Sequence, residues 1–219
     1  MGNDISRLEV VRGFEPVAHL TVEDVRQVVR RYIEDSPFPA LSFARFLDVL
    51  GDEESDAHKK AFSLLDRQGN GVIDGFMFLA GLCVVCSGPL KERMDLLYGI
   101  FDVNRDGALT WDALVLLVKS VERGLTSMTQ FEPIGRIDDL AVAMGKRAFQ
   151  SARRRQRDEA LTEGEWFAWW SLDSTVRTTL QRFCFDDADM EGLPPMENCD
   201  SVPYEVLAPD AGQAAGDGA

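Results

Sequence analysis

The sequence lacks the features that mark several common protein classes. It contains two histidines and four cysteines, and no apolar run approaches the roughly 20 residues that a membrane-spanning helix needs. The cysteines form no disulfide framework, and the one C-x-x-C pair, Cys83 and Cys86, has no second pair to complete a zinc site. No secretory signal peptide is recognisable. We therefore expect a folded protein of a reducing, cytoplasmic compartment, with these two cysteines in its core.

Basic charge is also scarce. Lys and Arg number 23 against 37 Asp and Glu, which gives a formal net charge of −14 and leaves no basic footprint for nucleic acid. Residues 186–219 carry nine carboxylates and no Lys or Arg, and their Pro, Ala and Gly offer too little apolar surface for folding. We expect no nucleic-acid partner and an acidic, disordered tail.

The two histidines, His19 and His58, have no nucleophile or metal ligand close to them in the sequence. We expect both to be solvated surface side chains. The chain is therefore predicted not to be an enzyme.

One stretch of the sequence matches a known metal-binding pattern. Residues 102–113 follow the calcium-loop pattern D-x-[DN]-x-[DN]-G over their first six positions, and Gly107 stands at the sharp turn. The candidate metal ligands of this loop are Asp102, Asn104, Asp106, Ala108 through its carbonyl, and Thr110. Position twelve, where the pattern requires a bidentate glutamate, is Ala113.

Residues 66–77 form a second candidate loop, again without the glutamate, because Met77 stands at position twelve. Its candidate ligands are Asp66, Gln68, Asn70, Val72 through its carbonyl, and Asp74. Calcium takes six to eight oxygens, and either loop supplies only about five from protein. We expect Ca²⁺ binding to be weak or lost at both loops, with Mg²⁺ as the alternative ion.

Two further segments fall in the same register, residues 34–45 and 154–165. All four loops have an apolar residue at position eight, namely Leu41, Ile73, Leu109 and Leu161. The first loop contains prolines and the fourth begins with Arg154, so neither is expected to bind calcium.

Apolar residues at helical spacing flank each loop, which predicts an all-α fold of four helix-loop-helix units in two pairs, with short β-bridges between paired loops. The predicted divisions are an N-terminal segment 1–20, a first pair 21–88, a second pair 89–185 and the tail 186–219. The helix that leaves the third loop is expected to end at Val121, and a linker is expected from Glu122 to Asp138.

These features resemble the EF-hand superfamily, and within it the neuronal calcium sensor, or recoverin-like, branch, with calcineurin B-like subunits as the second choice. The resemblance is carried by Met1-Gly2-Asn3, the degenerate loop start Glu34-Asp35-Ser36-Pro37, the continuous double unit 62–124 and the sequence Asp173-Ser174-Thr175-Val176-Arg177. It implies a myristoyl group that is buried or extruded with calcium, and a partner helix docked in an apolar groove.

The N-terminus also fits M-G-x-x-x-[ST], the signal for myristoylation of Gly2. One myristoyl chain gives only reversible membrane binding unless a second signal assists it. A basic group could supply that signal, but we rank a solvated face first, pairing with the acidic tail second and lipid contact third. Its members are Lys146, Arg147, Arg153, Arg154, Arg155 and Arg157.

Two functions follow from these patterns. The favoured one is a calcium-sensor-like adaptor that binds an amphipathic helix of a partner protein in an apolar groove, independently of calcium. The alternative is a calcium-responsive myristoyl switch, or a phosphatase regulatory subunit, that acts at a membrane. Both place the chain in the cytoplasm, with peripheral membrane contact in the alternative.

Overall fold

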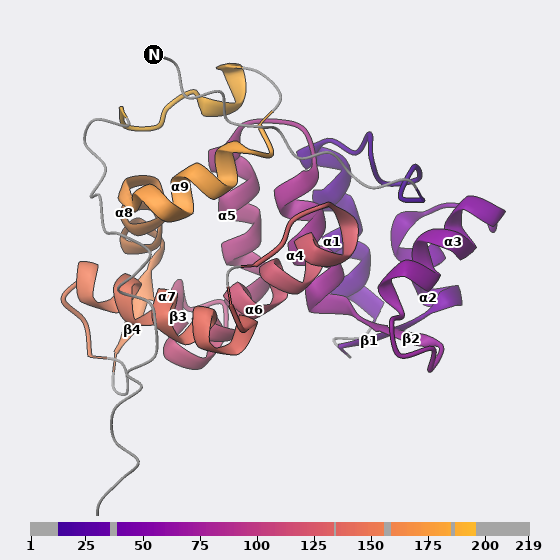
Figure 1. Ribbon diagram of the computed structural model, residues 1–219, viewed down its shortest axis with the longest axis horizontal. Coiled ribbons are helices and arrows are strands. Elements are labelled where there is room, and N and C mark those ends of the chain that lie inside the picture. The colour runs from indigo at the N-terminus through magenta and orange to yellow at the C-terminus, as the bar shows by residue number, and fades with distance from the viewer. Residues whose placement is uncertain (1–12, 36–38, 134, 156–158, 185–186, 196–219) are drawn as a thin grey trace, which may run out of the picture.

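The computed structural model describes residues 13–35, 39–133, 135–155, 159–184 and 187–195. These residues form helices and four short strands (Figure 1). Figure 1 shows α2, α3, β1 and β2 at one end of the long axis, and α7, α8, α9, β3 and β4 at the other. Helices α4, α5 and α6 lie between them. The predicted all-α fold with small strand pairs is confirmed.

The first two units form the first pair, and each contains one loop. Their elements are α1 (Val22–Asp35), β1 (Ala40–Ser42), α2 (Phe43–Leu50), α3 (Asp56–Leu65), β2 (Val72–Asp74) and α4 (Gly75–Val85). The predicted bridge joins the two loops, because Leu41 lies opposite Ile73 in an antiparallel pair.

The third and fourth units repeat this order. Their elements are α5 (Leu90–Phe101), β3 (Ala108–Thr110), α6 (Trp111–Met128), α7 (Ile137–Ser151), β4 (Ala160–Thr162) and α8 (Glu163–Leu172). Leu109 lies opposite Leu161 in the second antiparallel pair. Helix α9 (Ser174–Gln181) and a 3-10 turn, η1 (Asp187–Met190), follow.

A side-chain cap starts the helix that leaves each loop. The residue at position nine accepts a hydrogen bond from the backbone N–H three residues later, which serves one of the unpaired donors at a helix start. The capping residues are Ser42, Asp74, Thr110 and Thr162. The same local hydrogen bond therefore starts the helix that follows each of the four loops.

Helices α4 and α6 pack directly on each other through two glycines. A Cβ atom on Gly124 would lie 2.6 Å from the carbonyl oxygen of Met77 and 2.8 Å from Cα of Gly81. Arg67 of the second loop adds a hydrogen bond of 2.8 Å to the carbonyl of Thr126. The two pairs are thus held against each other by backbone contact.

This packing overturns one expectation. The linker predicted from Glu122 is wrong as far as Met128, because α6 continues helical to that residue. Gly124 suggested a helix end, but here it permits the close approach of α4, and burial of the flanking apolar residues offsets its low helix propensity.

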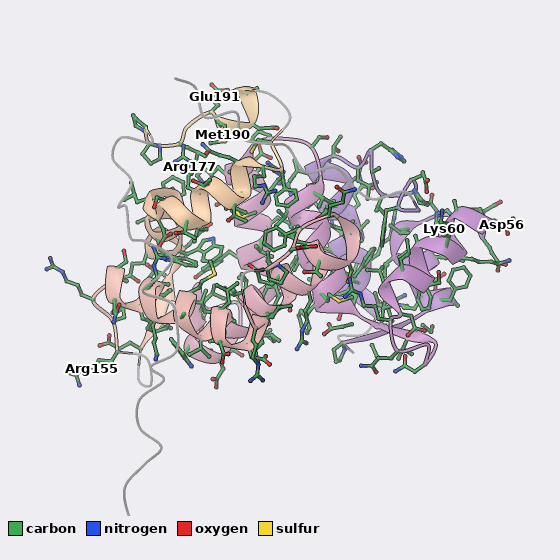
Figure 2. All side chains as sticks on the ribbon, in the orientation of Figure 1. Asp56, Lys60, Arg155, Arg177, Met190 and Glu191 are labelled. Carbon is green, nitrogen blue, oxygen red and sulfur yellow. The ribbon has the colours of Figure 1, made fainter. Side chains whose placement is uncertain are left out.

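Two buried arginines hold the C-terminal segment to the body. Arg93 donates to the carbonyls of Val84, Cys86 and Phe183, at 2.8, 2.8 and 3.1 Å. Arg177 on α9 donates to the carbonyl of Pro194 at 3.0 Å, beside the segment that carries Met190 and Glu191 (Figure 2). Residues 187–195 therefore differ from the disordered tail that the sequence predicted, whereas residues 196–219 lie outside the described part of the chain.

The predictions for single side chains have mixed outcomes. Cys83 and Cys86 are buried free thiols, as expected of core residues. His19 is exposed as predicted. The prediction for His58 is wrong, since it is buried and its ring nitrogens contact the Ser55 hydroxyl and the Asp52 carboxylate at 2.7 and 3.2 Å.

Replacement of Gly124 by alanine tests the contact between α4 and α6. The new Cβ meets backbone atoms that cannot rotate away, so we expect a loss of about 1–3 kcal/mol in the free energy of unfolding, measured by urea denaturation. Gly99 in α5 is the matched control, because its Cβ would meet nothing within 4 Å. Gly99→Ala should stabilise the protein by about 0.5–1 kcal/mol. Equal effects of the two substitutions would contradict the packing argument.

Candidate functional site

The second and third loops share one internal hydrogen-bond pattern. The carboxylate of Asp66 accepts the N–H groups of Asn70 and Gly71 at 3.1 and 2.7 Å. In the third loop Asp102 accepts from Asp106 and Gly107 at 3.2 and 2.9 Å. The residue at position one therefore organises the loop backbone around its own charge in both cases.

The backbone dihedral angles repeat in the same way. Position four is Gly69 in the second loop and Arg105 in the third, with φ values of 65° and 56°. Position six is Gly71 or Gly107, with φ values of 78° and 75°. Left-handed conformation at both positions closes a tight loop whose ligand positions are half-buried or exposed.

Both loops offer an incomplete set of oxygen ligands. Carboxylate, amide and carbonyl oxygens are the ligands that Ca²⁺ prefers, so the candidate residues of each loop suit the ion in kind. Their number is insufficient, because Ala113 and Met77 contribute no oxygen at position twelve. In the described part of the chain, no three or more His, Cys, Asp or Glu side chains group closely enough to hold a metal. Any bound Ca²⁺ would depend on water for its remaining ligands.

The second loop also borders a cleft of about 580 Å³. Met77 lies in its wall, together with Asp66 and Asp74 of the loop and Arg123 and Thr126 of α6. An apolar side chain thus stands where the loop pattern calls for a carboxylate.

The fourth loop supplies its own cation. Nε of Arg154, at position one, lies 2.9 Å from Oε1 of Glu165, at position twelve. The other oxygen of Glu165 accepts from the N–H and hydroxyl of Thr162, both at 2.9 Å, which completes a capping box. Burial pulls the pKa of Glu165 upward, but the hydrogen bonds from Thr162 and Arg154 outweigh it, so this pKa lies below its ordinary value.

The first loop has no comparable site among its described residues. Arg45, at its last position, donates to the carbonyl of Arg31 at 3.0 Å. Residues 36–38 and the side chain of Asp35 lie outside the described structure. A guanidinium that faces a helix carbonyl is a structural contact, and it leaves no carboxylate at position twelve.

The described members of the predicted basic group do not form one solvated face. Arg147 is only 14% exposed and pairs with the buried Asp173. Arg154 pairs with Glu165, whereas Arg155 extends outward from the fourth loop (Figure 2). Arg157 and Gly2 lie outside the described residues, so the lipidation site stays a prediction.

The sequence did not predict a cavity of about 50 Å³ next to Glu122, which we call the Glu122 cavity. Its walls come from α4, α5, α6, α7, α8 and α9. The lining residues outside α8 are Val84, Met94, Leu97, Leu117, Val118, Val121, Glu122, Leu125, Met144, Val176, Thr179 and Leu180, and α8 contributes Trp166, Trp169 and Trp170. Helix α9 thus covers the apolar face of the second pair with its own side chains.

Glu122 is the one carboxylate in this lining. It is 5% exposed, and its Oε2 has no hydrogen-bond partner among the described residues. Burial raises the pKa of Glu122 from its ordinary 4.5 to about 7. The sequence contained a signal for this position, because Leu114, Leu117, Val118, Val121 and Leu125 recur at helical spacing on both sides of it.

The comparisons with known proteins point to one class. No family model matches the chain. It is similar to a guanylyl cyclase inhibitory protein of Lithobates pipiens, 19% identical over 120 residues, and to the calcium-binding protein K of Dictyostelium discoideum, 28% identical over 135 residues. A guanylyl cyclase-activating protein 2 of Lithobates pipiens is 23% identical over 106 residues.

The matches are partial. They cover 52%, 57% and 47% of this chain, and 58%, 70% and 54% of the respective relatives. Together with the four paired loops, they support a divergent EF-hand protein that is similar to the neuronal calcium sensors. Its relatives are calcium-binding and regulatory proteins by name. In the described part of the chain, no helix is long and apolar enough to cross a membrane.

The pKa of Glu122 predicts a pH dependence of stability. The folded state keeps the proton of Glu122 up to about pH 7 and the unfolded state loses it near 4.5, so stability falls as pH rises between these values. The full loss is about 3 kcal/mol, at 1.36 kcal/mol per pH unit.

Glu122→Gln should remove this loss, as measured by urea denaturation at several values between pH 4.5 and 8. Glu132→Gln is the control, because Glu132 is exposed and the substitution makes the same change in charge. A constant difference in stability between Glu122→Gln and the unsubstituted protein across this range would contradict the assignment.

Proposed function

We propose that the chain is an EF-hand adaptor that binds an amphipathic helix of a partner protein and does so without requiring calcium. The observation that carries this proposal is the absence of an oxygen ligand at position twelve in the two loops that are otherwise well formed. The class of regulatory relatives supports a protein target, since two of them are named for action on guanylyl cyclase.

Position twelve matters because it belongs to the exit helix. In a calcium switch, the glutamate there ties the start of that helix to the ion, and binding moves the helix. Ala113 lies in the first turn of α6 and Met77 in the first turn of α4, so neither helix has this tie. An ion that binds in either loop therefore has no bond through which it could move the helix that follows.

The packing of α4 on α6 supports the same proposal. Opening either pair requires its exit helix to move, and these two exit helices meet at Gly81 and Gly124 with almost no space between their backbones. Arg154 and Glu165 already join the two ends of the fourth loop without a metal. These contacts favour a fixed binding surface over a switch.

The second candidate function is the calcium-responsive sensor. It is favoured by the repeated hydrogen bonds of Asp66 and Asp102, which keep both loops in a conformation suited to a cation. The name of the Dictyostelium relative supports a role for calcium in this class. Myristoylation of Gly2 and reversible membrane contact belong to this alternative.

Titration with calcium decides between the two. Trp111 is the first residue of α6 and packs edge-on against Phe149, with ring centroids 5.6 Å apart, so its emission reports on the third loop. For an adaptor we expect no heat and no change in Trp emission or terbium luminescence up to about millimolar Ca²⁺, the range of the weakest EF-hand modules. A saturable signal at micromolar Ca²⁺ would instead establish the sensor.

Restoring the missing ligand tests the role of position twelve. Ala113→Glu should create or tighten a site in the third loop by at least about tenfold, because it adds a bidentate carboxylate. Ala113→Met is the matched control, because its side chain is of similar size and carries no oxygen, and it should leave affinity unchanged. Unaltered calcium affinity in Ala113→Glu would show that position twelve is not what limits this loop.

A further inference from the structure

We propose that the Glu122 cavity is an anchor pocket for a cation on an apolar stem, an ammonium or guanidinium group that the partner helix inserts beside Glu122. The identity of the carrier rests on the proposed function. The preference of the cavity for a cation does not.

The charge of the pocket is the first argument. Glu122 is almost fully buried, and one of its oxygens meets no donor from the described residues. The lining contains no Lys, Arg or His, so its walls provide no counterion. A buried carboxyl group in this situation is costly, and a ligand that brings a positive donor removes that cost.

The walls form the second argument. Trp166, Trp169 and Trp170 line the cavity, and the faces of indole rings attract cations more strongly than other aromatic faces do. Leucine, valine and methionine side chains provide the apolar surface along which a Lys or Arg stem can lie.

The indole nitrogens of the three tryptophans are also buried and have no acceptor among the described residues. A cation does not serve these donors, but water does. A volume of about 50 Å³ holds roughly three to five water-sized groups, because one water needs about 10–15 Å³ by this measure, so the charged end of a stem fits beside water when the rest of the stem lies in the opening.

The cavity has an approach from solvent. Val121 on α6, Met144 on α7 and Thr179 on α9 line it and are only partly buried. The entry that the proposal requires for a stem lies between these three helices. The formal net charge of −14 attracts basic partners to the chain at long range.

A small probe tests the pocket without the partner. n-Butylammonium chloride and butan-1-ol have the same stem and differ in charge. At pH 8, where Glu122 is mostly ionised, we expect the ammonium to bind the full chain at least about tenfold more tightly than the alcohol. Tryptophan emission and chemical shifts of the indole N–H groups measure the binding, in solutions matched for ionic strength with NaCl.

Two variants assign the effect. Glu122→Gln should bring the affinity for n-butylammonium to within about twofold of that for butanol, whereas Glu132→Gln, with the same change in charge on the surface, should not alter it. Glu122→Gln removes a costly buried acid and is expected to fold. Equal binding of ammonium and alcohol by the unsubstituted protein, or an unchanged preference in Glu122→Gln, would overturn the proposal and leave the cavity to water alone.

A synthetic amphipathic helix of Leu and Lys separates this proposal from the proposed function. If the peptide fails to bind while n-butylammonium keeps its Glu122-dependent preference, the adaptor function falls and the cation pocket stands. If the peptide binds equally well to Glu122→Gln and to the unsubstituted protein, the anchor pocket is wrong and helix binding stands. We expect Glu122→Gln to weaken peptide binding by about tenfold and Glu132→Gln to leave it unchanged.

Discussion

The crossing of α4 and α6 constrains the rest of the molecule. Because Gly81 and Gly124 bring the two backbones together, the exit helices of the second and third loops share one interface. Each helix begins at its own loop cap, Asp74 or Thr110, so the crossing also fixes where those loops lie relative to each other. Movement of either exit helix would have to displace this contact.

The four loops share one framework of bridges and caps. The antiparallel bridges between residues at position eight and the caps at position nine need no metal, and both occur in all four units. In the fourth loop a guanidinium joins positions one and twelve. Such an exposed ion pair contributes little to stability, so the fold depends on its core and bridges rather than on this replacement.

The apolar face of the second pair is largely covered by the chain itself. Val176 and Leu180 of α9 close over the tryptophans of α8, and Arg93 and Arg177 hold the following segment in place. The small Glu122 cavity is the part of this face that these side chains do not fill. Because Oε2 of Glu122 has no hydrogen-bond partner among the described residues, this cavity has a chemical preference that an entirely apolar pocket would not have.

The sequence alone determined the repeated local structure. The loop register and the paired apolar residues such as Leu109 and Leu161 follow from spacing over a few residues, and the structure has these pairs in place. Only the tertiary structure decided the length of α6, the burial of His58 and the environment of Glu122. Whether a glycine ends a helix or permits a crossing, and whether a carboxylate meets water or tryptophan, depends on partners far away in the chain.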